Sequence, residues 1–244
     1  MGKLHRPGRP EDLPDARVLS ARWAAVALAT FDRDEELEPV QHRSGYWIDA
    51  DGLHWDDCGC TWWVLKWLGD GRAVLVGEDE SSEVKGYEPA IDLLAGAPEW
   101  VPRHYLRGLI DDYMVGCVYW FDEGAWHRAS YPDDLADDGL DCGISTLTTR
   151  ADAVDQIADR LEFDDGDAGL PELCAQLIDD AERGAITEHG LRSFAEEMTR
   201  LLNQHYPEDH HEPRTDADLA AMFALARRAG IDTGAWSGTL GVRA

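Results

Sequence analysis

The segment of residues 60–68 (CTWWVLKWL) constrains the fold most strongly, because apolar side chains occupy both sets of its alternating positions. Successive side chains of a β-strand point to opposite faces of a sheet, so a strand that is apolar on both faces has to be covered on both. We therefore predict a central strand with packed layers on its two sides. One face would carry Trp63, Leu65 and Trp67, and the other Trp62, Val64 and Leu68.

Turn residues on either side of this segment predict a sheet that is built from hairpins. Asp and Gly supply the backbone conformations that tight turns need. Asp51-Gly52 interrupts residues 46–55, Gly69-Asp70-Gly71 separates residues 60–68 from 72–78, and Asp122-Glu123-Gly124 separates residues 116–121 from 125–131. About three hairpins give an antiparallel sheet of about six strands, rich in tryptophan.

Helical patterns flank the predicted sheet and fill the rest of the chain. Apolar spacing predicts helices over residues 14–30, 89–94 and 100–113, with Pro102 moving the start of the last one later. Beyond residue 145 it predicts helices near 149–161, 171–183, 187–206 and 215–229, and the segment 164–167 is interpreted as a linker. Thr149-x-x-Asp152 and Thr215-x-x-Asp218 resemble capping boxes.

The grouping of strands before residue 145 and helices after it favours an α+β fold rather than alternating α/β units. We predict a Trp-rich antiparallel sheet with helices on one side, followed by a helical C-terminal part. Residues 1–145 would form the sheet domain. Residues 146–244 would form a helical region, either separate or packed as one body with the first.

The charge balance excludes several partners. The chain carries 22 basic and 49 acidic side chains, a net charge of −27. This charge repels phosphate backbones and anionic membrane surfaces, so we expect no nucleic-acid or membrane binding. No apolar stretch approaches the ~20 residues of a membrane span, and the first residues lack the pattern of a signal peptide. Five scattered cysteines favour a reduced, cytoplasmic protein over a disulfide framework.

The acidic segment that follows the strand of residues 72–78 is the first candidate site. Carboxylates at the end of a buried strand could bind a cation, serve as acid and base, or recruit a basic protein. A solvated loop is the plainer interpretation. The ten tryptophans favour an aromatic interface beside these acids, because tryptophan is enriched at binding hot spots. The predicted partner-binding residues are Glu78, Asp79, Glu80, Glu83, Trp62 and Trp67.

A second candidate site is the cluster of His205, Glu208, His210 and His211. Imidazoles and carboxylates are ligands of divalent metals, although the spacing lacks the helical H-E-x-x-H pattern and Pro207 interrupts the helix. An interhelical loop explains the same residues. No catalytic residue is assigned and no cofactor is expected, because the chain has neither a G-x-S-x-G elbow nor a phosphate-binding glycine loop.

Two classes of function remain open. The first is a non-enzymatic, acidic binding module that captures a basic protein, in the manner of immunity proteins and inhibitors that neutralise nuclease toxins. The alternative is a small metal-dependent hydrolase that uses the acidic or the His-rich loop. We favour the binding module because no complete catalytic pattern is present. The pattern leaves the oligomeric state open.

Overall fold

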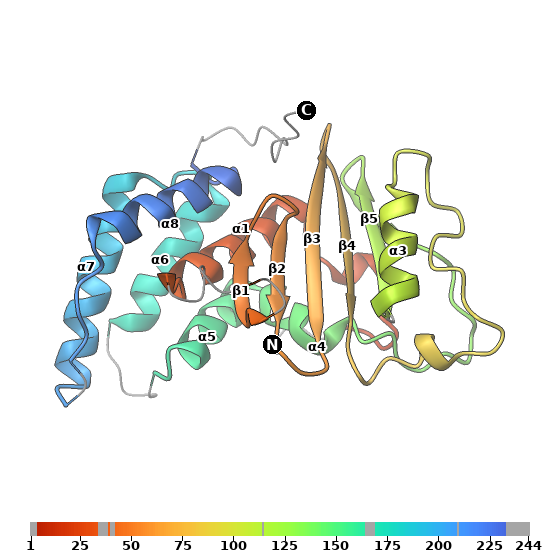
Figure 1. Cartoon of the computed structure of the whole chain (residues 1–244), viewed down its shortest axis with the longest axis horizontal. Helices are drawn as coiled ribbons and strands as arrows, with labels where there is room; N and C mark the ends of the chain where they lie inside the picture. Colours follow the sequence, from red (N-terminus) through yellow and green to blue (C-terminus); the bar gives the residue numbers. More distant parts are fainter. Residues whose placement is uncertain are drawn as a thin grey trace.

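A six-stranded antiparallel sheet forms the centre of the protein (Figure 1). The computed structural model describes residues 4–33, 39, 42–113, 115–163, 169–208 and 210–232. The strands pair in chain order, each with the next along the chain. They are β1 (Gly45–Ile48), β2 (Leu53–Asp56), β3 (Trp62–Gly69), β4 (Arg72–Glu78), β5 (Cys117–Asp122) and β6 (Ala125–Arg128). The sheet and its three hairpins confirm the predicted α+β class.

Every expected helical segment except residues 89–94 is a helix, and the short helix at residues 141–144 was not predicted. They are α1 (Ala16–Ala29), α3 (Arg103–Tyr113), α4 (Asp141–Ile144), α5 (Arg150–Arg160), α6 (Leu170–Glu182), α7 (Glu188–His205) and α8 (Asp216–Arg228), with single 3-10 turns at Pro10–Asp12, Val84–Gly86 and Ser145–Leu147. The threonine caps form as predicted: Thr149 and Thr215 each accept a hydrogen bond from the backbone N–H three residues later. The predicted linker at residues 164–167 lies outside the described residues.

The prediction of a helix over residues 89–94 is wrong. Residues 89–92 form a bend and irregular backbone instead, and a turn begins at Leu93. The Asp92 carboxylate accepts a hydrogen bond from the Leu94 N–H at 3.2 Å, and the Asp92 carbonyl accepts one from the Ala95 N–H at 2.9 Å. Leu93 and Leu94 are both buried. Packing of these two neighbouring side chains therefore outweighs the local helical pattern.

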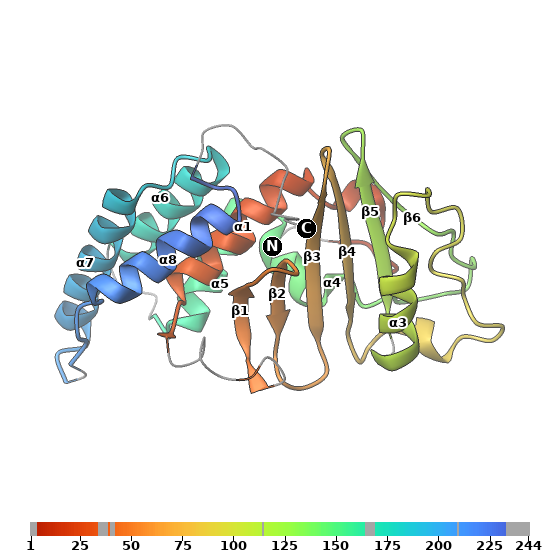
Figure 2. The ribbon, with the colours of Figure 1, turned by 45° about the horizontal axis from the view of Figure 1, so that its top comes forward.

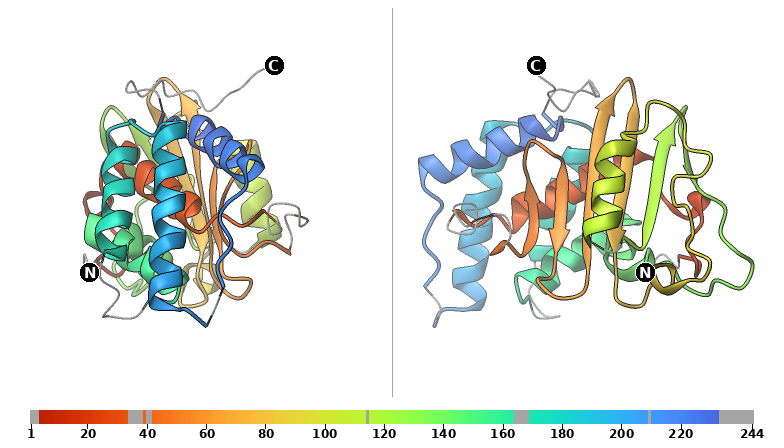
Figure 3. Two further views of the ribbon diagram at one scale, coloured as in Figure 1. Left: turned by 90° about the vertical axis from the view of Figure 1, so that its left-hand side faces the viewer. Right: turned by 45° about the vertical axis from the view of Figure 1, so that its right-hand side comes forward.

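Strand β3 has packed layers on both of its faces, as its sequence predicts. Trp63, Leu65 and Trp67 belong to the larger apolar cluster, which includes α1 and the C-terminal helices. Val64 belongs to a second cluster under α3, and Trp62 packs against that cluster from its edge. Figure 3 shows the sheet between the two layers, with α3 on one side and α1 on the other.

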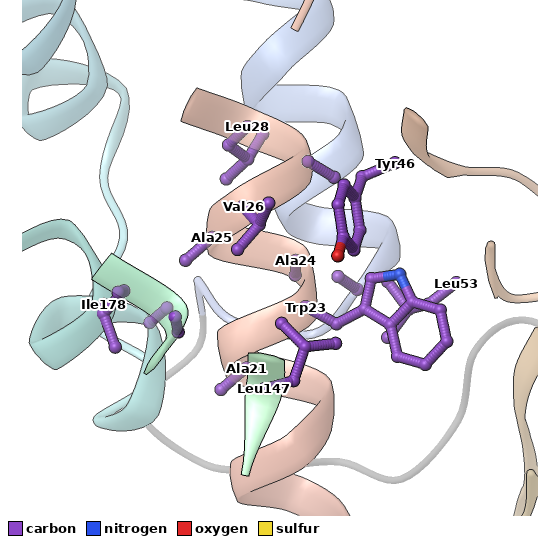
Figure 4. Packing of buried hydrophobic residues seen from close by; sticks show 14 of the residues in the cluster. Ala21, Trp23, Ala24, Ala25, Val26, Leu28, Tyr46, Leu53, Leu147 and Ile178 are labelled. Atoms are coloured by element: carbon purple, nitrogen blue, oxygen red, sulfur yellow. The ribbon is translucent and has the colours of Figure 1, made fainter. Parts of the chain in front are cut away.

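Helix α1 connects the sheet to the C-terminal helices. Its alanines let neighbouring elements approach closely, and it contacts the strands β1 and β2 and the helices α5, α6 and α8. In Figure 4, Trp23 of α1 lies beside Tyr46 and Leu53 of the sheet, while Ile178 of α6 lies on the opposite side of the helix. Figure 2 shows α8 lying across α1. One apolar cluster thus includes residues from both predicted regions.

Hydrogen bonds from indole N–H groups join the layers of the larger apolar cluster. Every tryptophan that the structure describes is buried or half-buried. Four indoles donate hydrogen bonds across the layers, which satisfies a polar group that burial would otherwise leave unpaired. The pairs are Trp23 to the His54 carbonyl (3.0 Å), Trp63 to the Cys142 carbonyl (2.8 Å), Trp67 to the Ser20 hydroxyl (2.7 Å) and Trp126 to the Pro14 carbonyl (2.7 Å).

The turn between β1 and β2 is organised by the Asp49 carboxylate. It accepts hydrogen bonds from the backbone N–H groups of Asp51 (2.7 Å) and Gly52 (3.2 Å), and lies 2.8 Å from His54 Nε2. Burial acts to raise the pKa of Asp49, but the hydrogen bonds and the His54 charge outweigh it and lower this pKa to about 2.

Within the described ranges, no helix is both long and apolar enough to cross a membrane.

Candidate functional site

The predicted acids and Trp62 meet at one end of the sheet, the lower end in the view of Figure 1. Strand β4 ends there and β3 begins there, so Trp62 pairs with Glu78 on one side and with Asp56 of β2 on the other. The loop of residues 136–142 lies against the same end, because the Glu83 N–H donates to the Asp137 carbonyl at 3.1 Å. The structure therefore brings Trp62 and the acidic segment together.

Glu78 is an ion-paired core residue. Only 7% of it is exposed, and its Oε1 atom pairs with the Lys85 ammonium. Burial raises the pKa of Glu78 above its usual range, although Lys85 acts in the opposite direction. Its Oε2 atom is buried without a hydrogen-bond partner in the described structure. A carboxylate in this position stabilises the end of β4 and offers little surface to a partner.

Asp79 and Glu83 are held in the turn that follows β4. The Asp79 carboxylate accepts hydrogen bonds from the Thr61 hydroxyl (2.6 Å) and the Ser81 N–H (2.9 Å). Burial acts to raise the pKa of Asp79, but these hydrogen bonds lower it below its usual range. The exposed Glu83 side chain accepts a hydrogen bond from the Ala136 N–H at 3.0 Å. Both carboxylates have structural partners within the chain.

Glu80 is exposed, and it lies beside the thiol of Cys60. A hydrogen bond to Glu80, together with its negative charge, raises the pKa of this thiol. The half-buried Cys142 thiol lies 3.8 Å from the Ser81 hydroxyl. Burial and the Asp79 carboxylate raise the pKa of Cys142 to about 11. The thiolate is the nucleophilic form of cysteine. Because the neighbouring carboxylates raise the pKa of both thiols, cysteine catalysis is disfavoured at neutral pH.

Tyr113 completes the site, and sequence analysis did not select it. It ends α3, is 60% exposed, and meets Trp62 edge-on with ring centroids 6.3 Å apart at 72°. Asp111 and Asp112 precede it and are exposed. We call Trp62 and Tyr113 the aromatic patch. The sequence signal was present, because an aromatic residue after two aspartates at the end of an amphipathic helix is a candidate for an exposed position.

Trp67 lies away from this site. It is five residues after Trp62 in the same strand, so its side chain points to the other face. It is 2% exposed and donates to Ser20 of α1. An indole in this position contributes to the core and has no surface to offer a partner.

The His-rich segment lies between α7 and α8, away from the acidic end of the sheet. His205 ends α7, and Glu208 is exposed in the loop that follows it. His210 Nε2 lies 2.9 Å from Glu212 Oε1, and both side chains are exposed. Among the residues that the structure describes, no three histidines, cysteines or acids lie together closely enough to hold a metal ion. Neither the acidic nor the His-rich segment therefore forms a metal site from described residues.

Comparisons of the chain with protein-family models, with curated proteins and with solved structures find no match.

Proposed function

We propose that this chain is a non-enzymatic binding protein that captures a basic protein at the acidic end of its sheet. The observation that carries the proposal is the exposed Tyr113, which packs on Trp62 and directly follows the exposed Asp111 and Asp112. Large aromatic side chains supply most of the binding energy at many interfaces, and surrounding acids steer a cationic partner. The net charge of −27 adds long-range attraction for such a partner.

The partner chemistry follows from the same features. An exposed aromatic anchor on a strongly acidic protein matches a protein surface rich in Arg and Lys, such as one that binds phosphates in a nuclease. This is the mode of action of immunity proteins and inhibitors. A cytoplasmic location belongs to the same proposal, and it is supported by the lack of any disulfide between the five cysteines, all of which lie in the described ranges.

The test begins with affinity capture from the native lysate at low salt, and continues with the purified captured protein. Tyr113→Ala should weaken binding about tenfold or more, the loss typical of an aromatic hot spot. The charge variant Glu80→Gln/Asp112→Asn should weaken binding and flatten its salt dependence. Its matched control is Asp155→Asn/Glu196→Gln, which removes the same charge from exposed positions on α5 and α7.

Two results would refute the proposal. One is the capture of no basic protein by the wild-type chain. The other is an equal loss of affinity in the charge variant and its control, because binding would then depend on net charge alone and not on this end of the sheet. Calorimetry at two salt concentrations measures the affinity of each variant and its salt dependence, and circular dichroism checks that each variant is folded.

A further inference from the structure

A second site lies at the opposite part of the molecule, between α7, α8 and the segment that joins them. A cavity of about 240 Å³ opens there beside the ends of α1 and α5. Its apolar wall includes Phe194, Met198, Leu202 and Met222. For comparison, an engineered apolar cavity of about 150 Å³ is large enough to bind benzene. The space therefore suits a small organic molecule with an apolar body.

Most of the polar residues that line this cavity come from the segment between α7 and α8. His211 lines it, and the His211 Nε2 atom is buried without a hydrogen-bond partner in the described structure. The backbone around this histidine is fixed, because the Asn203 side chain donates to the His211 carbonyl and accepts from the His211 N–H, both at 2.9 Å. A buried polar atom that is held in place without a partner is unusual in a folded protein and requires an explanation.

The charged groups of the lining favour an anion. Arg214 lines the cavity, its guanidinium lies 5.9 Å from the Phe31 ring, and it forms no ion pair with any residue in the described ranges. Glu212 also lines the cavity, but its carboxylate is paired with His210. The guanidinium is therefore the charge that remains available. Arginine binds carboxylates with particular strength and geometric preference.

We propose that this cavity binds a small monocarboxylate, with its apolar body between α7 and α8 and its carboxylate at Arg214 and His211 Nε2. The ligand would give the His211 Nε2 atom a hydrogen bond and would place an anion beside the Arg214 guanidinium, which has no ion pair among the described residues. This site is independent of the proposed capture of a basic protein, because none of its residues belongs to the aromatic patch or to the acidic end of the sheet.

Octanoate is the probe for the test, with octanol as its uncharged counterpart. We expect calorimetry of the full chain to show saturable octanoate binding, and NMR to show a shift of the His211 ring signals. Arg214→Gln should weaken octanoate binding about tenfold while leaving octanol unchanged, because only the anion uses the guanidinium. Arg200→Gln is the matched control, since Arg200 lies on α7, outside the lining, and pairs with Glu197.

Met198→Trp should abolish binding of both probes by filling the cavity. Because this variant could disturb folding, circular dichroism and thermal unfolding accompany it, and Arg214→Gln, an exposed position, provides the second line of test. No octanoate binding up to its solubility limit would overturn the proposal. So would equal affinity for octanol, or an equal loss in Arg200→Gln. None of these results depends on whether a basic partner is captured.

Discussion

Ser20→Ala tests the way in which tryptophan fastens the sheet to α1. The Ser20 hydroxyl accepts the hydrogen bond of the Trp67 indole at 2.7 Å, and the two residues are 1% and 2% exposed. Alanine removes the acceptor and leaves a buried N–H group that water cannot reach. The cost of such an unsatisfied donor is about 1–3 kcal/mol, which corresponds to a fall in melting temperature of about 2–12 °C for a chain of this size.

A second effect of this substitution has the opposite sign and has to be subtracted. Alanine has the higher helix propensity, which contributes up to about 0.5 kcal/mol of stabilisation. Ser193→Ala measures this contribution, because Ser193 is an exposed residue within α7. Urea unfolding of the two variants gives the difference in the free energy of unfolding. If Ser20→Ala were as stable as Ser193→Ala, the indole hydrogen bond would contribute nothing and the reasoning would be refuted.

A double-mutant cycle then assigns the loss to the pair. Trp67→Phe removes the indole N–H together with part of the ring. In the Ser20→Ala background the N–H is already unpaired, so its removal should cost about 1 kcal/mol less than in the wild-type chain. Equal costs in the two backgrounds would show that Ser20 acts through packing alone.

Two further predictions concern acid stability and glycine. The depressed pKa of Asp49, about 2, means that its carboxylate stabilises the fold at neutral pH and that this contribution is lost as the pH falls from about 4 to about 2; Asp49→Asn should therefore lower the free energy of unfolding at pH 7 and converge with the wild type below pH 2. Gly77→Ala should be strongly destabilising, because the new Cβ would lie 2.3 Å from the Trp63 ring, whereas Gly108→Ala in α3 meets open space and should stabilise by about 0.5–1 kcal/mol. Urea titrations at several pH values compare Asp49→Asn with the wild type, and thermal unfolding compares Gly77→Ala with Gly108→Ala. Convergence of the Asp49 pair already at pH 5, or equal behaviour of the two glycine variants, would contradict these predictions.

Local sequence patterns were sufficient to predict most of the fold. The two-faced apolar alternation of β3, the Asp-Gly turns and the threonine caps each depend on residues close together in the chain, and all of them appear in the structure. The non-helical structure of residues 89–94 was not predicted because burial of Leu93 and Leu94 depends on the sheet and α3. Tertiary packing outweighs local propensity at such positions.

The candidate site was only partly predictable, for a similar reason. Alternation places Trp62 and Trp67 on opposite faces of β3, but it does not show which of these faces stays partly uncovered. That depends on where α3 ends, because Tyr113 meets Trp62 there and stays 60% exposed. The cavity at His211 is less visible still in the sequence. Its walls come from helices and a connecting segment that only the tertiary structure brings together.

The acidic composition itself has two different origins. Many of the aspartates form turns or caps, in which the carboxylate accepts the N–H of the residue two positions ahead and so fixes the backbone locally. This arrangement occurs at Asp15, Asp49, Asp56, Asp57, Asp79, Asp92, Asp137 and Asp138. A count of acids therefore overstates the charge that is free to bind a partner.

The acids that bear on partner binding are those without such a structural role. Asp111 and Asp112 form no hydrogen bond or ion pair through their carboxylates with the residues that the structure describes, and they directly precede Tyr113. Asp79, by contrast, is the most densely bonded of the predicted acids, and its removal would disturb the turn after β4 as well as the charge. Charge substitutions at Glu80 and Asp112 therefore separate binding from folding, whereas substitutions at Glu78 or Asp79 would change both at once.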